Sequence, residues 1–255
     1  MLRPRIIPVL LLAASGAVKT RQFKARQYVG DPINALKVFN EKEVDEIVMV
    51  DIEATVAGRG PNFSWIRDLA SECFMPMAYG GGIQSVAHAE QLFSLGVEKI
   101  ILGTVAMERP GVVASIVRAA GAQSVAISLD VRRNWRGRNH VCVRSGTTDT
   151  GHDPVEAAKR IQDLGAGEII LQSIDRDGMS SGYDLDLIAK VSSAIQIPLV
   201  ACGGAGKLED FRAALGAGAS AAAAGSYFVF FGKHRAVLIT YPRPDEVASI
   251  NDTAN

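Results

Sequence analysis

Four aspartates stand at or just beyond the ends of apolar runs, where a carboxylate could transfer a proton: Asp51, Asp130, Asp175 and Asp177. A carboxylate placed against a substrate can act as a general acid or base, which accelerates a reaction roughly a hundred- to ten-thousand-fold. Asp130 is the preferred catalytic candidate because it closes the apolar run "SVAISLD" (124–130). Asp51 and Asp175 could equally hold a loop or cap a helix.

Glycine turns follow several of the same apolar runs. Glycine lets backbone N–H groups approach a phosphate closely, and the N-terminus of a following helix adds a favourable dipole. These residues could instead make tight turns only, but their occurrence in pairs favours phosphate binding. The predicted phosphate-binding residues are Gly81, Gly82, Gly103, Thr104, Asp177, Gly178, Gly203, Gly204, Gly225 and Ser226.

Eight short apolar runs must position these residues, and they lie at 5–12, 46–51, 75–80, 99–103, 124–130, 168–173, 197–203 and 219–226. Amphipathic windows with helix-start signals such as Asp31-Pro32, Asp153-Pro154 and Asp184 separate them. Nearly continuous apolar strands are typical of a parallel sheet covered by helices. The pattern predicts an α/β fold of the (β/α)8 (TIM) barrel type, whose active site lies at the carboxyl ends of the strands. The polar stretch 132–153 is expected to be an elaborated loop on that face.

The sequence also repeats itself at about half its length. Residues 77–106, "MAYGGGIQ" onward, resemble residues 199–228, "LVACGGAG" onward. We therefore expect one domain, 1–255, built from two similar half-barrels at about 1–122 and 123–255. This repeat places two phosphate sites on opposite sides of one barrel mouth.

Composition narrows the range of functions. Twenty-seven basic residues balance 27 acidic ones, so there is no electrostatic footprint for nucleic acid or an anionic membrane. The three cysteines and four histidines show no zinc spacing, and we expect no metal, no cofactor and reduced thiols. Neither a signal peptide nor an apolar stretch of about 18 residues is present, which predicts a cytoplasmic protein.

Seven segments in order resemble the HisF family, the cyclase subunit of imidazole glycerol phosphate synthase. They are "RIIPVL", "GAVK", "GDP", "DEIVMVDIEA", "GGGIQ", "GAGEIILQSIDRDGMSSGYD" and "GGAGK". The resemblance implies a barrel that receives ammonia from a HisH-like glutaminase at its N-terminal face and uses it at the opposite mouth on a bisphosphate-type substrate. It also implies an ammonia gate at Arg5, Glu46, Lys99 and Glu168, and a substrate contact from Lys19.

One position departs from the family pattern. The family uses two aspartates as acid and base, at the tips of strands one and five, and Asp130 matches the second. The first aligns with Leu11, in "PVLLLAASG" where the family reads roughly "PCLDVKDG". Leucine cannot transfer a proton. Gly103 and Gln172 also stand where the family usually has asparagine and threonine.

Three hypotheses follow. The first is a divergent HisF-like subunit that conducts ammonia to a separate amidotransferase, as second HisF-like copies do in surface-polysaccharide pathways that amidinate a nucleotide sugar. The second is a working imidazole glycerol phosphate synthase cyclase of histidine biosynthesis. The third is a non-catalytic scaffold that activates its glutaminase partner. Gene neighbourhood separates the first two: nucleotide-sugar genes favour one and a histidine operon favours the other.

Overall fold

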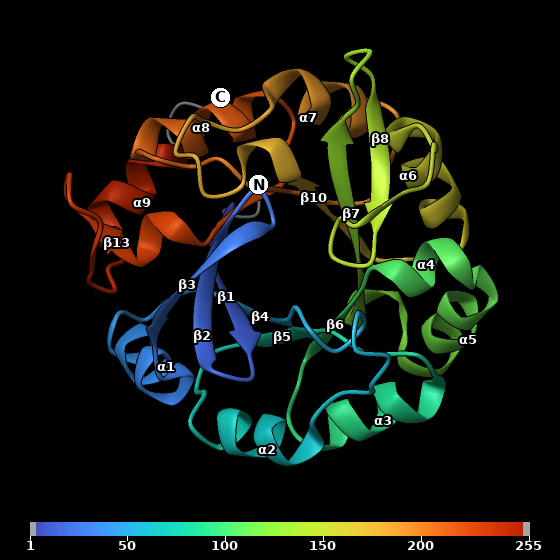
Figure 1. Cartoon of the computed structure of the whole chain (residues 1–255), viewed down its shortest axis with the longest axis horizontal. Coiled ribbons are helices and arrows are strands. Elements are labelled where there is room, and N and C mark those ends of the chain that lie inside the picture. The colour runs from blue at the N-terminus through green and yellow to red at the C-terminus, as the bar shows by residue number, and fades with distance from the viewer. Residues whose placement is uncertain (1–3, 252–255) are drawn as a thin grey trace.

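The computed structural model describes residues 4–251, so the ends of the predicted domain 1–255 lie outside the described residues. Eight parallel strands form its centre: β1 (Arg5–Ala13), β4 (Ile47–Asp51), β5 (Met77–Gly80), β6 (Lys99–Leu102), β7 (Val125–Arg133), β10 (Glu168–Ser173), β11 (Leu199–Cys202) and β12 (Ala221–Ala224). Each pairs with the next, and β12 pairs back with β1 through Ile7 and Ala223. The ring is therefore closed, and the predicted (β/α)8 barrel is confirmed (Figure 1).

Helices surround this ring (Figure 1). They are α1 (Pro32–Glu41), α2 (Phe63–Ser71), α3 (Val86–Ser94), α4 (Thr104–Glu108), α5 (Pro110–Ala120), α6 (Pro154–Asp163), α7 (Leu185–Ser192), α8 (Leu208–Gly216) and α9 (Pro244–Asn251). The predicted helix starts are confirmed, because Asp31, Asp153 and Asp184 are N-caps whose carboxylates accept backbone N–H bonds of the first turn. Such caps fix where each helix leaves the preceding loop.

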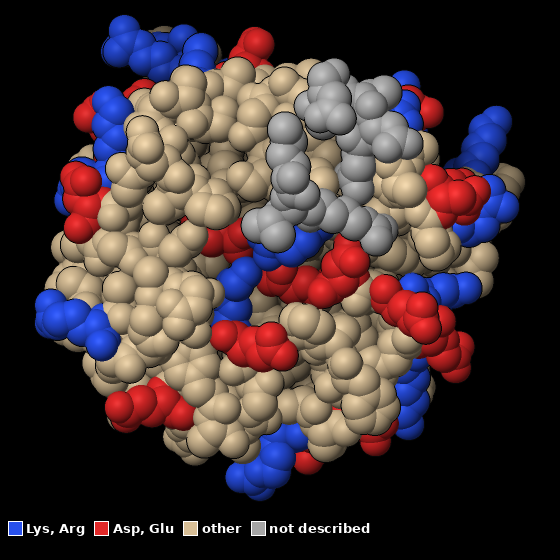
Figure 2. Space-filling model, turned by 180° about the vertical axis from the view of Figure 1, so that it is seen from behind, with Lys and Arg blue, Asp and Glu red and all other residues tan. Residues whose placement is uncertain are grey.

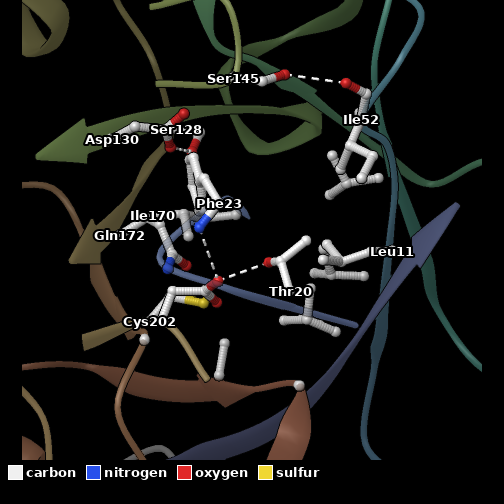
Figure 3. A pocket seen from close by; sticks show the side chains of 18 of the residues that line it. Leu11, Thr20, Phe23, Ile52, Ser128, Asp130, Ser145, Ile170, Gln172 and Cys202 are labelled. Carbon is white, nitrogen blue, oxygen red and sulfur yellow. Dashed lines mark hydrogen bonds between the residues drawn. The ribbon is translucent and has the colours of Figure 1, made fainter. Parts of the chain in front are cut away.

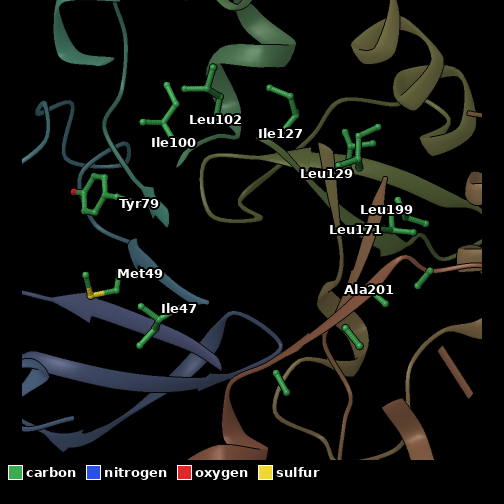
Figure 4. Close-up of a cluster of buried hydrophobic side chains, with 14 of the residues drawn as sticks. Ile47, Met49, Tyr79, Ile100, Leu102, Ile127, Leu129, Leu171, Leu199 and Ala201 are labelled. Carbon is green, nitrogen blue, oxygen red and sulfur yellow. The ribbon is translucent and has the colours of Figure 1, made fainter. Parts of the chain in front are cut away.

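Side chains of each strand alternate between two apolar layers. Ile47 and Met49 of β4 point outward into the core beneath the helices (Figure 4), whereas Val48 points into the barrel interior. The interior layer consists of Ile7, Val48, Ala78, Ile101, Ala126, Ile170, Val200, Cys202, Ala221 and Ala223, with Val9 and Val50 packed against it. Burial on both faces explains why the strands read as apolar runs.

Three hairpins depart from the simple barrel. β2 (Gly16–Arg21) and β3 (Lys24–Gly30) form the first, and β13 (Phe230–Phe231) pairs with β14 (Ala236–Val237) in the third. In the second, β7 continues past Asp130 to pair with β8 (Asn139–Val143), which pairs with β9 (Thr148–Asp149). The stretch 132–153, which we expected to be an elaborated loop, does connect barrel strand β7 to helix α6, but part of it is folded as a hairpin. Its polar side chains suit strands that leave the barrel.

The same backbone contacts recur in the two halves of the ring. The N–H of Ile47 donates to the carbonyl of Pro76 at 2.9 Å, and the N–H of Ile169 donates to that of Pro198 at 3.0 Å. This contact makes β4 and β10 equivalent. β1 and β7 are then equivalent too, because they precede β4 and β10 in the two halves. The half-barrel boundaries themselves stay a prediction.

Candidate functional site

A pocket opens at the carboxyl ends of the barrel strands, and we call it the mouth pocket (Figure 3). Its lining contains most of the residues singled out in the sequence: Leu11, Lys19, Gly81, Gly103, Thr104, Asp130, Gln172, Asp177, Gly178, Gly203, Gly204, Gly225 and Ser226. Among the predicted phosphate-binding residues, Gly82 is outside the lining. Its N–H points to the Thr55 hydroxyl, 3.4 Å away, and the residue is buried beneath the turn.

Asp130 lies on the wall formed by β7. The hydroxyl of Ser128, two residues earlier on the same face, donates to its carboxylate at 2.8 Å. Burial raises the pKa of Asp130 to about 6, against the opposing effect of the Ser128 hydrogen bond, and the nearby Asp177 raises it further. A carboxyl group that titrates near neutral pH can both accept and return a proton.

Leu11 occupies the equivalent place on β1, on the opposite side of the pocket in Figure 3. In register, Leu11 is the partner of Val50 on β4, as Asp130 is the partner of Gln172 on β10. Val50 and Gln172 hold the same position in the two halves. The wall of the pocket formed by β1 and β4 is therefore apolar at the level where the wall formed by β7 and β10 carries the Asp130 carboxylate and the Gln172 amide.

The glycine turns on the two sides of the mouth have the same geometry. Gly81 has φ +119°, and a Cβ there would lie 2.5 Å from the carbonyl oxygen of Asp51. Gly203 has φ +90°, and its Cβ would lie 2.7 Å from that of Ser173. Any side chain would collide with the preceding strand end in both turns, so the paired glycines are required by the fold itself. Phosphate binding at these turns stays a prediction.

Asp177 links the segment after β10 to the β2–β3 hairpin. Its carboxylate accepts the Thr20 hydroxyl at 2.6 Å and the Phe23 N–H at 3.3 Å, while its own N–H donates to Ile174. These bonds hold the β2–β3 hairpin over the mouth pocket, and both are accepted by one carboxylate oxygen, Oδ2. Asp177 also lines the pocket, and phosphate binding by this residue stays a prediction, although an ionised carboxylate repels a phosphate.

Asp51 and Asp175 have the loop-holding role that the sequence left open. The carboxylate of Asp51 accepts the N–H groups of Glu53 and Ala54 and pairs with Arg59 at 2.9 Å. Asp175 accepts the N–H of Arg133 at 2.7 Å, which ties the outer end of the β7–β8 hairpin to the segment that follows β10. Asp130 is thus the strand-tip aspartate that remains available in the mouth pocket.

Lys19 is buried at the mouth, with only 3% of its surface exposed. Its ammonium group donates to the carbonyl oxygen of Val9, and it passes Gly225 so closely that a Cβ there would lie 2.8 Å from Nζ. Burial lowers the pKa of Lys19 to about 8, although the charge of Asp177 opposes this change. After Asp130, Lys19 is therefore a second group in the pocket whose pKa lies near neutral pH.

The sequence reasoning missed several lining residues, among them Phe23, Ser128 and Cys202. The alternation along "SVAISLD" places Ser128 on the same face as Asp130, so this signal was available. Phe23 reaches the pocket through the β2–β3 hairpin, which the sequence analysis did not predict.

At the opposite end of the barrel, four charged residues meet in what we call the floor ring: Arg5, Glu46, Lys99 and Glu168. Arg5 pairs with both glutamates, and Lys99 pairs with Glu168 at 2.7 Å and with Glu46 at 3.3 Å. Burial alone would lower the pKa of Arg5, but Glu168 and Glu46 raise it above its ordinary value. Figure 2 shows basic and acidic residues gathered near the centre of this face. The structure thus brings the four predicted gate residues together.

Two further searches of residues 4–251 gave negative results. No helix in this range is long and apolar enough to cross a bilayer. Nor does the range contain a group of three or more His, Cys, Asp or Glu side chains arranged to hold a metal ion.

The fold and the mouth pocket define an α/β barrel with a pocket at the carboxyl ends of its strands, where barrels of this type have their active sites. The model of the family described as "Histidine biosynthesis protein" matches residues 5–235, and the chain belongs to this family. It is 48% identical over 247 residues, 95% of this chain and 97% of the relative, to "Putative imidazole glycerol phosphate synthase subunit hisF2" of Pseudomonas aeruginosa. It is also 46% identical to the subunit named hisF3 of Vibrio vulnificus, covering 96% of this chain and 95% of the relative. The HisF subunit of Metallosphaera sedula is 43% identical over 88% of this chain and 89% of the relative. The chain is thus a member of the HisF family.

Proposed function

We propose that the chain is a HisF-like synthase subunit that receives ammonia from a HisH-like glutaminase and conducts it through the barrel to a separate amidotransferase. The ammonia would serve the amidination of a nucleotide sugar in surface-polysaccharide biosynthesis. The observation that carries this proposal is the contrast between a complete floor ring and a mouth pocket with Leu11 at the tip of strand one.

The floor ring supports the proposal that ammonia enters the barrel at this end. Glu46 and Glu168 are each 6% exposed, and each contacts both cations. Withdrawing charges from water is expensive unless they are well paired, so a ring of this kind is a costly way to close a barrel whose strand starts could be apolar. We assign the ring to gating, and the surrounding N-terminal face, which includes Glu98, to the glutaminase interface.

The interior above the ring supports passage of a neutral molecule. Its lining is mostly aliphatic, with small side chains such as Ala78, Ala126 and Ala221 among the larger ones. Neutral ammonia crosses such a layer more easily than ammonium, whose charge would lose its hydration. The mouth pocket extends down to Val48 and Ile170 of this same layer, so the upper part of the route is already open.

The lining of the mouth pocket supports the proposal that this chain has lost cyclase activity. Proton transfer at strand one needs a titratable group, and neither Leu11 nor its register partner Val50 carries one. Most of the glycines predicted to bind phosphate line the pocket together with Ser226, so a phosphorylated small molecule could still bind there. We expect no metal or other cofactor to take part.

The second candidate is an imidazole glycerol phosphate synthase cyclase of histidine biosynthesis. It is favoured by Asp130, which has the pKa and position of an acid/base group, and by the names of the relatives. Lys19, whose pKa of about 8 also suits proton transfer, would then have to replace the missing aspartate. The third candidate, a scaffold that only activates the glutaminase, would leave the floor ring without a transport role.

One assay tests the proposal. Purified protein is supplied with ammonium salt and the ribulosyl bisphosphate-type substrate of ordinary HisF proteins, and cyclised product is measured. We expect no more than a trace, because acid/base catalysis contributes roughly a hundred- to ten-thousand-fold. Turnover within about tenfold of an ordinary HisF would overturn the proposal in favour of the cyclase.

A further inference from the structure

The tip of the β7–β8 hairpin, residues 133–138, presents a bare aromatic side chain. Trp135 is 86% exposed, and Arg133, Arg136 and Arg138 beside it are exposed as well. A single exposed hydrophobic residue needs no explanation on a protein surface. Two further properties of this tip do call for one.

The first property is that the tip is held in one shape. The side-chain oxygen of Asn134 accepts the N–H groups of Arg136 at 2.9 Å and Arg138 at 3.0 Å, while its own N–H donates to the Arg138 carbonyl at 2.8 Å. Gly137, with φ +76°, completes the turn. A pre-ordered tip loses little conformational freedom when a partner binds it.

The second property is an excess of unpaired positive charge. Among the described residues 4–251, no ion pair involves Arg136 or Arg138, whereas Arg133 pairs with Asp184 at 3.6 Å. The Arg136 guanidinium lies 4.5 Å from the centre of the Trp135 ring, so the two side chains form one compact unit. Tryptophan and arginine are the residues that most often dominate the binding energy of protein interfaces.

The tip is also well placed. β7 ends at Arg133, three residues after Asp130, so the tip that carries Trp135 begins roughly 10 Å beyond the mouth wall. Figure 1 shows the hairpin reaching past α7 at the rim of the barrel. A protein bound here would stand beside the opening from which ammonia leaves. A short path matters because free ammonia becomes protonated in water and no longer acts as a nucleophile.

We infer that this tip docks the ammonia-consuming amidotransferase, with Trp135 inserted in an apolar depression that acidic side chains surround. The inference rests on the proposed function. Charge complementarity selects an acidic protein surface. A nucleic acid fits less well, because the chain carries no net charge and the cationic surface is confined to one hairpin.

The test measures binding of the purified sugar amidotransferase from the same genome to the complex of this chain with its glutaminase. Variants are Trp135→Ala and the double change Arg136→Glu with Arg138→Glu. The matched control is Arg67→Glu with Arg118→Glu, two exposed arginines on α2 and α5 at the side of the barrel. Glutaminase binding at the floor is measured for every variant to show that the barrel is folded.

We expect both hairpin variants to weaken amidotransferase binding by about tenfold or more, with wild-type binding falling at high salt and the control pair unchanged. Equal binding by wild type and hairpin variants would overturn the inference, as would no binding to the wild type or preferential binding of nucleic acid. The cyclase assay above reads the proposed function independently. Suppose that the wild type shows no cyclase activity and that the variant without the hairpin arginines delivers ammonia as well as the wild type. The docking site is then refuted, and the proposed function is not.

Discussion

The two halves of the barrel share a backbone but differ in the chemistry at their strand tips. β4 and β10 make the same contact to the following strand, and Gly81 and Gly203 press against equivalent carbonyl groups. At the floor, both halves contribute a glutamate to one ring. At the mouth, the second half carries Asp130, whereas the first carries Leu11 in the same register.

This difference shows that the fold does not depend on a carboxylate at the strand tip. The strand tip at β1 accepts an apolar side chain without any loss of register, because the ladder bonds and glycine turns determine the geometry. Selection on function can therefore change the residue at the tip of β1 and leave the β7 wall of the mouth pocket, the glycine turns and the floor ring intact. Each of the following predictions changes one of these parts separately.

The largest expected effect is that of Leu11→Asp. If the first half lacks only its carboxylate, this change restores ammonia-dependent cyclisation by roughly a hundred- to ten-thousand-fold over the wild-type trace. Steady-state product formation with ammonium salt measures it, and Leu11→Asn is the matched control without a titratable group. Continued silence would mean that Gly103 and Gln172 have also remodelled the mouth.

The next largest effect tests the shared backbone. We expect Gly81→Ala and Gly203→Ala each to lower the free energy of unfolding by about 2–4 kcal/mol, because both glycines have positive φ and no room for a Cβ. Denaturant unfolding measures this loss, and Gly111→Ala, where a Cβ meets no atom within 4 Å, should be neutral or stabilising. A large loss in only one half would break the equivalence of the two turns.

A smaller effect concerns the pH dependence of stability. The folded-state pKa of Asp130, about 6, lies above its ordinary value of 3.8, so ionising this group opposes folding. The opposition is absent below the ordinary pKa, grows as the pH rises, and is complete above about pH 6. Asp130→Asn should therefore raise the free energy of unfolding by about 1–3 kcal/mol at pH 7.5 and by less at pH 5. The reverse order in denaturant unfolding would contradict the burial of this carboxyl group.

Much of this architecture could be predicted from the sequence, because the responsible signals are local. Apolar runs gave the eight strands, Asp31, Asp153 and Asp184 marked helix starts, and the repeat placed the glycine turns on both sides of the mouth. The role of Asp177 could not be predicted in this way. Its hydrogen bond to Thr20 joins residues 157 positions apart in the sequence. This bond depends on the β2–β3 hairpin, which the hydrophobic pattern of the sequence did not predict.

We propose that the floor ring admits ammonia to the barrel, and the variant Lys99→Ala tests this role. Lys99 bridges Glu46 and Glu168, so its loss leaves two carboxylates in the ring with Arg5 as their remaining cation. We measure amidinated product formed from glutamine and from ammonium salt in the complex with glutaminase and amidotransferase. The exposed Lys37→Ala on α1 serves as control.

We predict that Lys99→Ala lowers the glutamine-driven rate and its coupling to glutamine hydrolysis by about tenfold or more, as expected for an uncompensated buried charge. Because Arg5 still pairs with both glutamates, the same variant should lower the stability of the barrel without unfolding it, and Lys37→Ala should change neither the rate nor the stability. If Lys99→Ala leaves the glutamine-driven rate and its coupling unchanged, the four residues are a structural ion cluster and the ammonia entrance lies elsewhere.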